Sequence, residues 1–202
     1  MIKIEDIKAI PKSDLKEASR ALSKEDVPQL VEWLSLKDDN IRYQAFLLLQ
    51  NRSSYFNDVY PYWDIFQNKL KSDNSYQRSI GLMLIAENVK WDKQNKMSDT
   101  IDDFLKFLDD ERPITVRQCI QALGKISTFQ PSLSEVIAST LLSFDYMAVK
   151  ETMRKSILLD ILNVLRIIRK DRNADEIEVF ILNALSGGVL DRKSKGQIEA
   201  LL

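Results

Sequence analysis

The chain has 202 residues, of which 45% are hydrophobic, and a formal net charge of −1, so it can bury a sizeable core but lacks the basic excess of a sequence-independent nucleic-acid binder. Glycine and proline number only five each, which is too few for a turn-rich β protein. With one cysteine and no histidine, the chain cannot form an internal disulfide, a nucleophile–histidine pair or a histidine-ligated metal site.

The N-terminal segment MIKIEDIKAIPK carries a charge every few residues and does not resemble a signal peptide. No run of about 18 uncharged apolar residues, the length needed to span a membrane, occurs in the sequence. Together with the single cysteine, which is typical of a reducing compartment, these features predict a cytoplasmic protein without a membrane anchor.

Residues 1–22 predict an N-terminal cap for the elements that follow. Ser13 is the expected N-cap of a short helix, and Leu15, Ala18 and Leu22 give that helix one apolar side. The isoleucines before it are expected to pack loosely on the first repeat. They are Ile2, Ile4, Ile7 and Ile10.

Five helix pairs follow the cap, and each has a first helix, a short polar turn and a second helix. The predicted repeats cover about residues 23–56, 57–92, 93–129, 130–172 and 173–202. The second helices are expected near residues 41–51, 74–88, 113–126 and 149–170, with a short helix closing the chain. The fifth first helix is expected from Ala174 to Leu185, with Gly187 and Gly188 as its C-cap pair. The chain is thus predicted to be a single repeat domain, 1–202.

The central second helix, RPITVRQCIQALGKI, has the clearest pattern in the chain. Pro113 predicts its start. Apolar residues recur at three- and four-residue steps and predict one buried stripe: Val116, Cys119, Ile120, Leu123 and Ile126. Because Cys119 is the small member of that stripe, we expect a buried, inert thiol rather than a nucleophile.

A basic residue recurs at the same place in each predicted second helix. These residues are Arg42, Arg78, Arg117, Arg154 and Lys193, and they are separated by 36, 39, 37 and 39 residues. A period in the high thirties is typical of stacked helix pairs. The four arginines are expected to bridge to acids of the adjacent turn rather than to contact phosphates.

The segments DDNIRYQA and PITVRQCIQALGKI resemble the second helix of a HEAT repeat, with its acidic turn, its hydrophobe–arginine pair and its small residue. SDNSYQRSIGLMLIAENVKWD also resembles a small bacterial HEAT-repeat family, some members of which are labelled SufBD-like. The resemblance implies an all-α fold, an α-α superhelix (solenoid) of about five HEAT-like helix pairs with an N-terminal capping helix. It implies no iron–sulfur chemistry here, since a cluster needs several thiolates.

The resemblance favours a non-catalytic protein-interaction or scaffold module, and the sequence offers no catalytic, cofactor-binding or metal-binding residues. The alternative is a nucleic-acid-binding or DNA-repair protein of the HEAT-like alkylpurine glycosylase type. Arg78 in SDNSYQRS resembles part of that family's pattern. Gln77 stands where a second basic residue is expected, however, and Tyr76 replaces the usual tryptophan.

In HEAT-like solenoids the second helices line the concave face, where partners bind. The residues of the second helices that point away from the apolar stripe are therefore the candidate partner-binding residues: Tyr43, Leu47, Ser79, Met83, Gln118, Gln121, Lys125, Lys155, Leu159, Asn163 and Arg166. Aromatic and methionine side chains beside amides and cations suit a protein or peptide ligand rather than nucleic acid. The alternative is that packing between repeats buries some of these positions.

Two other groups of residues are candidates for surface roles. The aromatic residues Tyr55, Phe56, Tyr60, Tyr62, Trp63 and Phe66 could form a stacking platform, and Tyr55 and Tyr60 are its expected exposed members. A cluster of cations is expected to be the solvated end of a long helix, where cations suit the helix dipole. Its members are Arg166, Arg169, Lys170 and Arg172.

Overall fold

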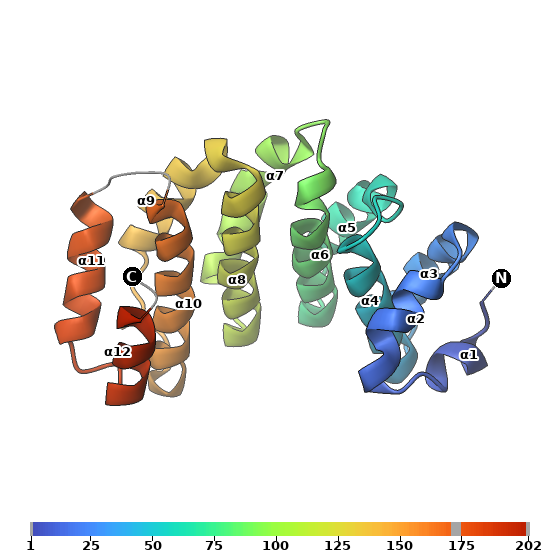
Figure 1. The fold of residues 1–202 in the computed structure, drawn as a ribbon, viewed down its shortest axis with the longest axis horizontal. Helices are drawn as coiled ribbons and strands as arrows, with labels where there is room; N and C mark the ends of the chain where they lie inside the picture. Colours follow the sequence, from blue (N-terminus) through green and yellow to red (C-terminus); the bar gives the residue numbers. More distant parts are fainter. Residues whose placement is uncertain (1, 171–174, 201–202) are drawn as a thin grey trace. The chain divides into compact units, whose positions relative to one another are not determined.

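The structure, a computed structural model, describes residues 2–170 and 175–200 (Figure 1). All regular secondary structure in these ranges is helical, which confirms the all-α prediction. Contacts group the chain into two compact units, residues 1–96 and 97–202, and each is described by itself.

The first unit is built around one long helix, α4. Its helices are α1 (Ile4–Lys8), α2 (Leu15–Ala21), α3 (Val27–Trp33), α4 (Asp39–Ser53), α5 (Trp63–Leu70) and α6 (Ser75–Asn88). Helices α1, α2, α3 and α6 all pack against α4, and α5 packs along α6. The α3–α4 and α5–α6 pairs coincide with the first two predicted helix pairs. Each predicted polar turn caps its second helix, because Asp38 accepts hydrogen bonds from the α4 backbone and Asn74 from the α6 backbone.

The N-terminal segment packs on α4 more firmly than the sequence suggested. Ile7 is fully buried, and the Gln44 side chain donates hydrogen bonds to the carbonyl oxygens of Ile7 (3.1 Å) and Ile10 (2.8 Å). Ser13 is not the cap of α2, since its hydroxyl bonds to the Asp14 carboxylate instead. The burial of Ile7 and the hydrogen bonds from Gln44 together hold this segment on α4.

The C-terminal end of α4 carries a buried ion pair. Arg52 is 4% exposed, and its guanidinium lies 2.6 Å from the Asp58 carboxylate. The same guanidinium donates hydrogen bonds to the carbonyl oxygens of Ser19 (3.0 Å) and Leu22 (2.8 Å), at the end of α2. Arg52 thereby connects the end of α2 and the loop after α4 to the C-terminal end of α4.

Trp91, in the turn after α6, reaches the end of α4 in the first helix pair. Its indole Nε1 donates a 2.8 Å hydrogen bond to the carbonyl oxygen of Ser53, the last residue of α4. Asn88, at the end of α6, donates a 3.0 Å bond to the Ser53 hydroxyl. These two bonds join the ends of α4 and α6.

Lys69, on α5, is a buried lysine that takes part in no salt bridge in the described ranges. Lys69 is 8% exposed, and its ammonium donates hydrogen bonds to Ser35 Oγ (3.0 Å) and Gln77 Oε1 (2.5 Å). Burial, together with the nearby charge of Arg42, lowers the pKa of Lys69 from 10.5 to about 8. The folded state therefore disfavours the charged ammonium.

We expect this lysine to make the stability depend on pH. Between pH 8 and pH 10.5 the unfolded chain keeps the Lys69 proton while the folded chain has lost it, so the free energy of unfolding rises with pH across this window. Denaturant unfolding of the wild type and of Lys69→Met, compared at pH 7.5 and pH 10.5, isolates the contribution. The wild type should gain stability relative to the variant at the higher pH, and a difference that does not change with pH would contradict the expectation.

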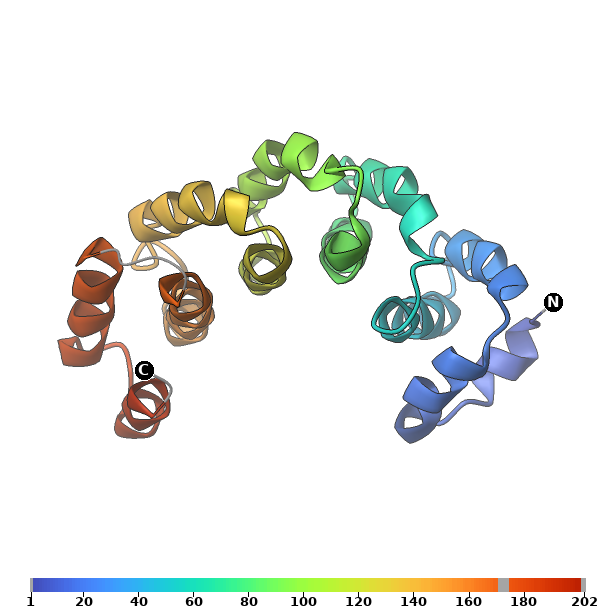
Figure 2. The same ribbon diagram turned by 45° about the horizontal axis from the view of Figure 1, so that its top comes forward.

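The second unit is built around α10. Its helices are α7 (Lys96–Leu105), α8 (Pro113–Phe129), α9 (Ser134–Ser143), α10 (Glu151–Arg169), α11 (Asp175–Ser186) and α12 (Arg192–Glu199). Helices α8, α9, α11 and α12 pack against α10, and the 3-10 turn after α7 packs against α8. Figure 2 shows α8 and α10 side by side, with α9 in the neighbouring layer.

The central second helix, RPITVRQCIQALGKI, folds as its pattern predicts. Helix α8 begins at Pro113, and the whole predicted stripe is buried. The Cys119 thiol is fully buried and lies 3.3 Å from the carbonyl oxygen of Phe104, to which it donates. Burial raises the pKa of the Cys119 thiol, so the side chain is a packed small residue rather than a thiolate nucleophile.

The ends of α5 and α11 add detail to the predictions. Within the predicted second repeat, 57–92, helix α5 starts at Trp63, because Pro61 lies in a 3-10 turn that precedes it. Helix α11 ends at Ser186, directly before the predicted C-cap pair Gly187 and Gly188, but neither glycine has the positive φ that glycine caps commonly adopt. The predicted start of this helix at Ala174 lies outside the described residues.

Candidate functional site

The candidate residues of the first unit divide into exposed and covered positions. Tyr43 is 52% exposed and lies against Phe46, with 6.2 Å between the ring centroids. Leu47 and Met83 are half-buried, and Ser79 is buried. Ser79 is therefore not a surface residue. Helix α6 packs against both α4 and α5, so more of its circumference is covered than a single apolar stripe predicts.

The candidate residues of the second unit lie on α8 and α10. Gln121, Lys125, Lys155 and Asn163 are exposed. The other three are half-buried: Gln118, Leu159 and Arg166. Gln118 Oε1 and Arg166 Nε are buried and find no hydrogen-bond partner in the described part of the chain.

Lys155 has a structural partner. Its ammonium is paired with the Asp191 carboxylate, which also accepts a 2.8 Å hydrogen bond from the Ser194 backbone at the start of α12. The bonds from Lys155 and Ser194 hold the pKa of Asp191 well below its usual range. Lys155 thus links α10 to α12, which the repeat pattern did not indicate.

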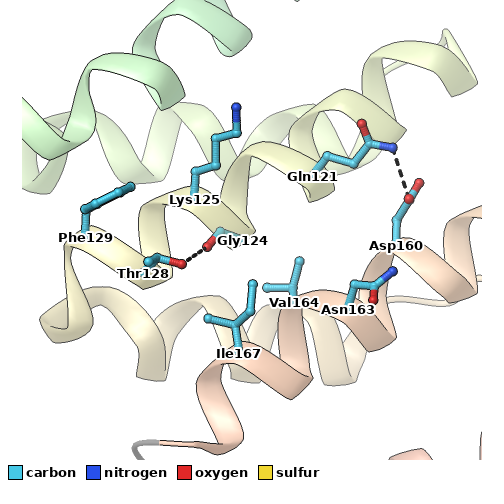
Figure 3. A pocket seen from close by; sticks show the side chains of 9 residues that line it. All are labelled: Gln121, Gly124, Lys125, Thr128, Phe129, Asp160, Asn163, Val164 and Ile167. Atoms are coloured by element: carbon cyan, nitrogen blue, oxygen red, sulfur yellow. Dashed lines mark hydrogen bonds between the residues drawn. The ribbon is translucent and has the colours of Figure 1, made fainter. Parts of the chain in front are cut away.

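A groove of about 250 Å³ opens between α8 and α10 (Figure 3). Gln121, Lys125 and Asn163 of the predicted set line it. The sequence did not single out its other lining residues, which are Gly124, Thr128, Phe129, Asp160, Val164 and Ile167.

The floor of the groove is apolar and depends on a glycine. A Cβ atom at Gly124 would lie 3.5 Å from both Ile167 Cδ1 and Val164 Cγ2, so the missing methyl group leaves open space between the helices. The Thr128 hydroxyl donates a 2.8 Å bond to the Gly124 carbonyl and is thereby satisfied. Phe129, 49% exposed, forms one end of the groove. This end and the floor suit an apolar side chain.

The other end of the groove is polar and held in place. Asp160, largely buried on α10, accepts a 2.6 Å hydrogen bond from Arg117 Nε and a 3.0 Å bond from Gln121 Nε2. The Gln121 side chain therefore reaches across from α8 to α10 (Figure 3). Because Arg117 neutralises Asp160, the groove ends in oriented amide and carboxylate groups with balanced charge.

The four arginines of the repeat all bind groups of their own unit, and Arg42 binds an acid of the adjacent turn. Arg42 pairs with Asp39 and also donates to the Leu36 carbonyl. Arg117 instead reaches Asp160 on α10, the next second helix. The other two donate to carbonyl oxygens of the turn before their own helix: Arg78 to Ser72 and Asp73, and Arg154 to Val149. Arg78 and Arg154 reach these carbonyl oxygens because each side chain folds back over the start of its own helix.

The aromatic cluster of the first unit does not form a stacking platform. Trp63 and Phe66 are fully buried. Tyr55 is half-buried with the Arg20 guanidinium 4.3 Å from its ring centroid, and the Tyr60 hydroxyl donates a 2.7 Å bond to Asp92. Burial and the Asp92 carboxylate raise the pKa of Tyr60 to about 12. The prediction that Tyr55 and Tyr60 are the exposed members was wrong, and Phe56 is exposed instead.

The cation cluster at the end of α10 is partly paired. The Arg169 guanidinium forms an ion pair with Glu178 of α11. Arg166 is half-buried and Lys170 exposed, while Arg172 lies outside the described residues. Pairing within the unit removes part of the positive surface that four neighbouring cations suggested.

The described residues hold neither a cluster of metal ligands nor a membrane-spanning helix. In residues 2–170 and 175–200 no group of three or more His, Cys, Asp or Glu side chains is placed to hold a metal ion. No helix in the same ranges is both long and apolar enough to cross a membrane.

Comparisons with known proteins show a similarity in fold. No protein-family model matches the sequence, and no curated protein matches it. Among solved structures, the crystal structure of an engineered protein, a target of the Northeast Structural Genomics Consortium, is similar over 100% of this chain and 96% of its own, with a TM-score of 0.53. The two sequences are 15% identical, so the likeness concerns the fold alone.

Proposed function

We propose that the protein is a non-catalytic, cytoplasmic interaction or scaffold module that binds a protein or peptide on the face of its second helices. The groove between α8 and α10 is the observation that carries this proposal. The proposal includes a HEAT-like architecture, in which five helix pairs and the cap formed by residues 1–22 build one solenoid domain. The second helices then line its concave side.

The groove suits a partner side chain rather than a small-molecule substrate. Its volume of about 250 Å³ lies below the range of pockets that enclose small ligands. An exposed aromatic ring, an apolar floor and a rim of Gln121, Lys125 and Asn163 match the usual anatomy of a protein-binding hot spot. The partner therefore presents an apolar side chain to the floor and polar groups to the rim.

Partner capture with two groove variants tests the proposal. Capture from native cell extract, quantified by mass spectrometry, should fall by about tenfold or more for Phe129→Ser, since an anchoring contact is removed. Gly124→Ala should also weaken capture, because its methyl group fills the floor at contact distance from Ile167 and Val164. Neither change should reduce thermal stability.

Matched controls come from the same unit. Ile114, 53% exposed near the start of α8, does not line the groove, and Gly196 on α12 has open space around its Cβ position. Ile114→Ser and Gly196→Ala should leave capture unchanged. If the controls and the groove variants behaved alike, the groove would not be the binding site.

The glycosylase alternative predicts tight binding to DNA, and we expect none. Phosphate contacts require accessible clusters of Lys and Arg, whereas Arg42, Arg117 and Arg154 all donate to groups of their own unit. A fluorescently labelled duplex titrated at about 150 mM salt should show no submicromolar affinity. Submicromolar binding would favour the DNA-repair function over the proposed one.

A further inference from the structure

The second unit has another and larger groove, with a volume of about 830 Å³. It lies where the turn after α7 and the start of α8 meet the end of α9 and the loop leading into α10. None of the candidate partner-binding residues and none of the residues lining the α8–α10 groove contributes to it. It is therefore a separate surface from the one to which the proposed function refers.

The floor of this larger groove is apolar. Leu108, Val116 and Ile157 form its buried part. Phe144 and Val149, at the end of α9 and in the following loop, are half-buried and stand nearer the opening. Contact between such a floor and water is unfavourable, and the free energy falls when another apolar side chain covers the floor.

The rim of the groove is acidic. Asp109, Asp110, Glu111 and Asp145 line it, against one cation, Lys150. In the described ranges the exposed carboxylates of Asp109, Glu111 and Asp145 take part in no salt bridge. These charges therefore remain available to a positively charged partner.

Local hydrogen bonds hold two of the four carboxylates in position. Asp145 accepts bonds from the backbone N–H groups of Met147 (2.9 Å) and Ala148 (3.2 Å), and Asp110 accepts one from the N–H of Arg112 (2.8 Å). Carboxylates that their own loops orient lose little conformational freedom when a ligand binds. The rim is accordingly preorganised on both sides of the groove.

We propose that this groove docks a basic peptide segment, in which a lysine or arginine lies next to an aliphatic or aromatic residue. The apolar residue covers the floor formed by Val149 and its neighbours, and the cation pairs with the rim acids. Charge complementarity selects the basic partner and speeds its association. The volume is at the upper end of the range for bound small ligands and accommodates two or three side chains.

A random 12-residue peptide library displayed on phage is the probe. The library is first depleted on the variant Asp109→Asn/Glu111→Gln/Asp145→Asn, which keeps the shape of the rim but removes three charges. It is then selected on the wild-type chain. The surviving peptides should be enriched in Lys or Arg adjacent to Leu, Ile, Val or Phe. Synthetic copies should bind the variant about tenfold or more weakly, and their affinity should fall with salt.

Two substitutions in the α9–α10 loop separate groove binding from simple attraction of charge. Val149 lines the groove, whereas Met147 is exposed and does not. Val149→Ser should weaken the selected peptides, and Met147→Ser should not. Phe129→Ser, in the other groove, should also leave them unaffected, so a failure of this proposal is distinct from a failure of the proposed function.

Several results would overturn the inference. One is that no peptide survives selection after depletion, and another is that the selected peptides are not enriched in Lys or Arg. A third is that Val149→Ser does not weaken the selected peptides, which would then adsorb through charge alone. If the triple variant loses thermal stability, the single change Asp109→Asn, which alters only an exposed carboxylate, replaces it in the depletion step. Unchanged binding of the selected peptides to Asp109→Asn and to Glu111→Gln would again show that the rim acids do not bind them.

Discussion

Replacing Arg52 with methionine is expected to lower the free energy of unfolding by about 3–5 kcal/mol. The substitution leaves the largely buried Asp58 carboxylate without the guanidinium that lies 2.6 Å from it. It also removes the donors to the Ser19 and Leu22 carbonyls, which lie at the end of α2. Stability measured by urea unfolding should therefore drop because charge and carbonyl groups become unpaired, and not because packing volume is lost.

Two further variants identify the cause of this loss. Arg52→Met/Asp58→Leu removes both charges and should recover part of the stability, since no uncompensated charge is left in the interior. Lys106→Met removes the exposed ion pair with Asp103 and should leave the unfolding midpoint nearly unchanged. A small effect of Arg52→Met, similar to that of Lys106→Met, would show that water reaches and solvates Asp58.

Gly81→Ala is expected to destabilise the protein by about 3 kcal/mol, although alanine is intrinsically the better helix former. A Cβ atom at this position of α6 would lie 2.7 Å from the carbonyl oxygen of Phe66 and 2.9 Å from Leu70 Cδ2. The first of these atoms belongs to the backbone of α5, so the clash is relieved only by moving one helix away from the other. Thermal or urea unfolding measures the loss.

Gly196→Ala is the matched control for Gly81→Ala. Its Cβ position in α12 has no heavy atom within 4 Å, so alanine should be neutral or should stabilise by about 0.5–1 kcal/mol. If Gly81→Ala were equally harmless, α5 and α6 would be able to separate without cost. The pair of glycines thus distinguishes the effect of helix propensity from that of the close approach between α5 and α6.

The two grooves of the second unit differ in chemistry. Balanced amide and charged groups surround the groove between α8 and α10, whereas four carboxylates surround the larger groove. Partners that fit the two grooves need not compete, since no residue lines both. Under the two proposals above, the second unit would hold two peptide segments at once.

The helices and their buried faces could be predicted from the sequence alone. Pro113 at the start of α8, the buried stripe that includes Cys119, and the capping residues Asp38 and Asn74 all follow from patterns only a few residues long. Such features depend on local backbone geometry and on the 3.6-residue period, so they can be read without knowing the neighbours.

The grooves and the partners of the charged residues could not be predicted in this way. Arg117 and Asp160 are 43 residues apart, and their contact depends on how α8 and α10 cross. The acids at 109–111 and Asp145 come from different turns, and they share a rim because the loops before α8 and α10 meet. Periodicity shows which face of a helix is apolar. The packing of helices against one another sets which of the remaining side chains lie across a gap, and that packing is the sum of many weak contacts between distant segments.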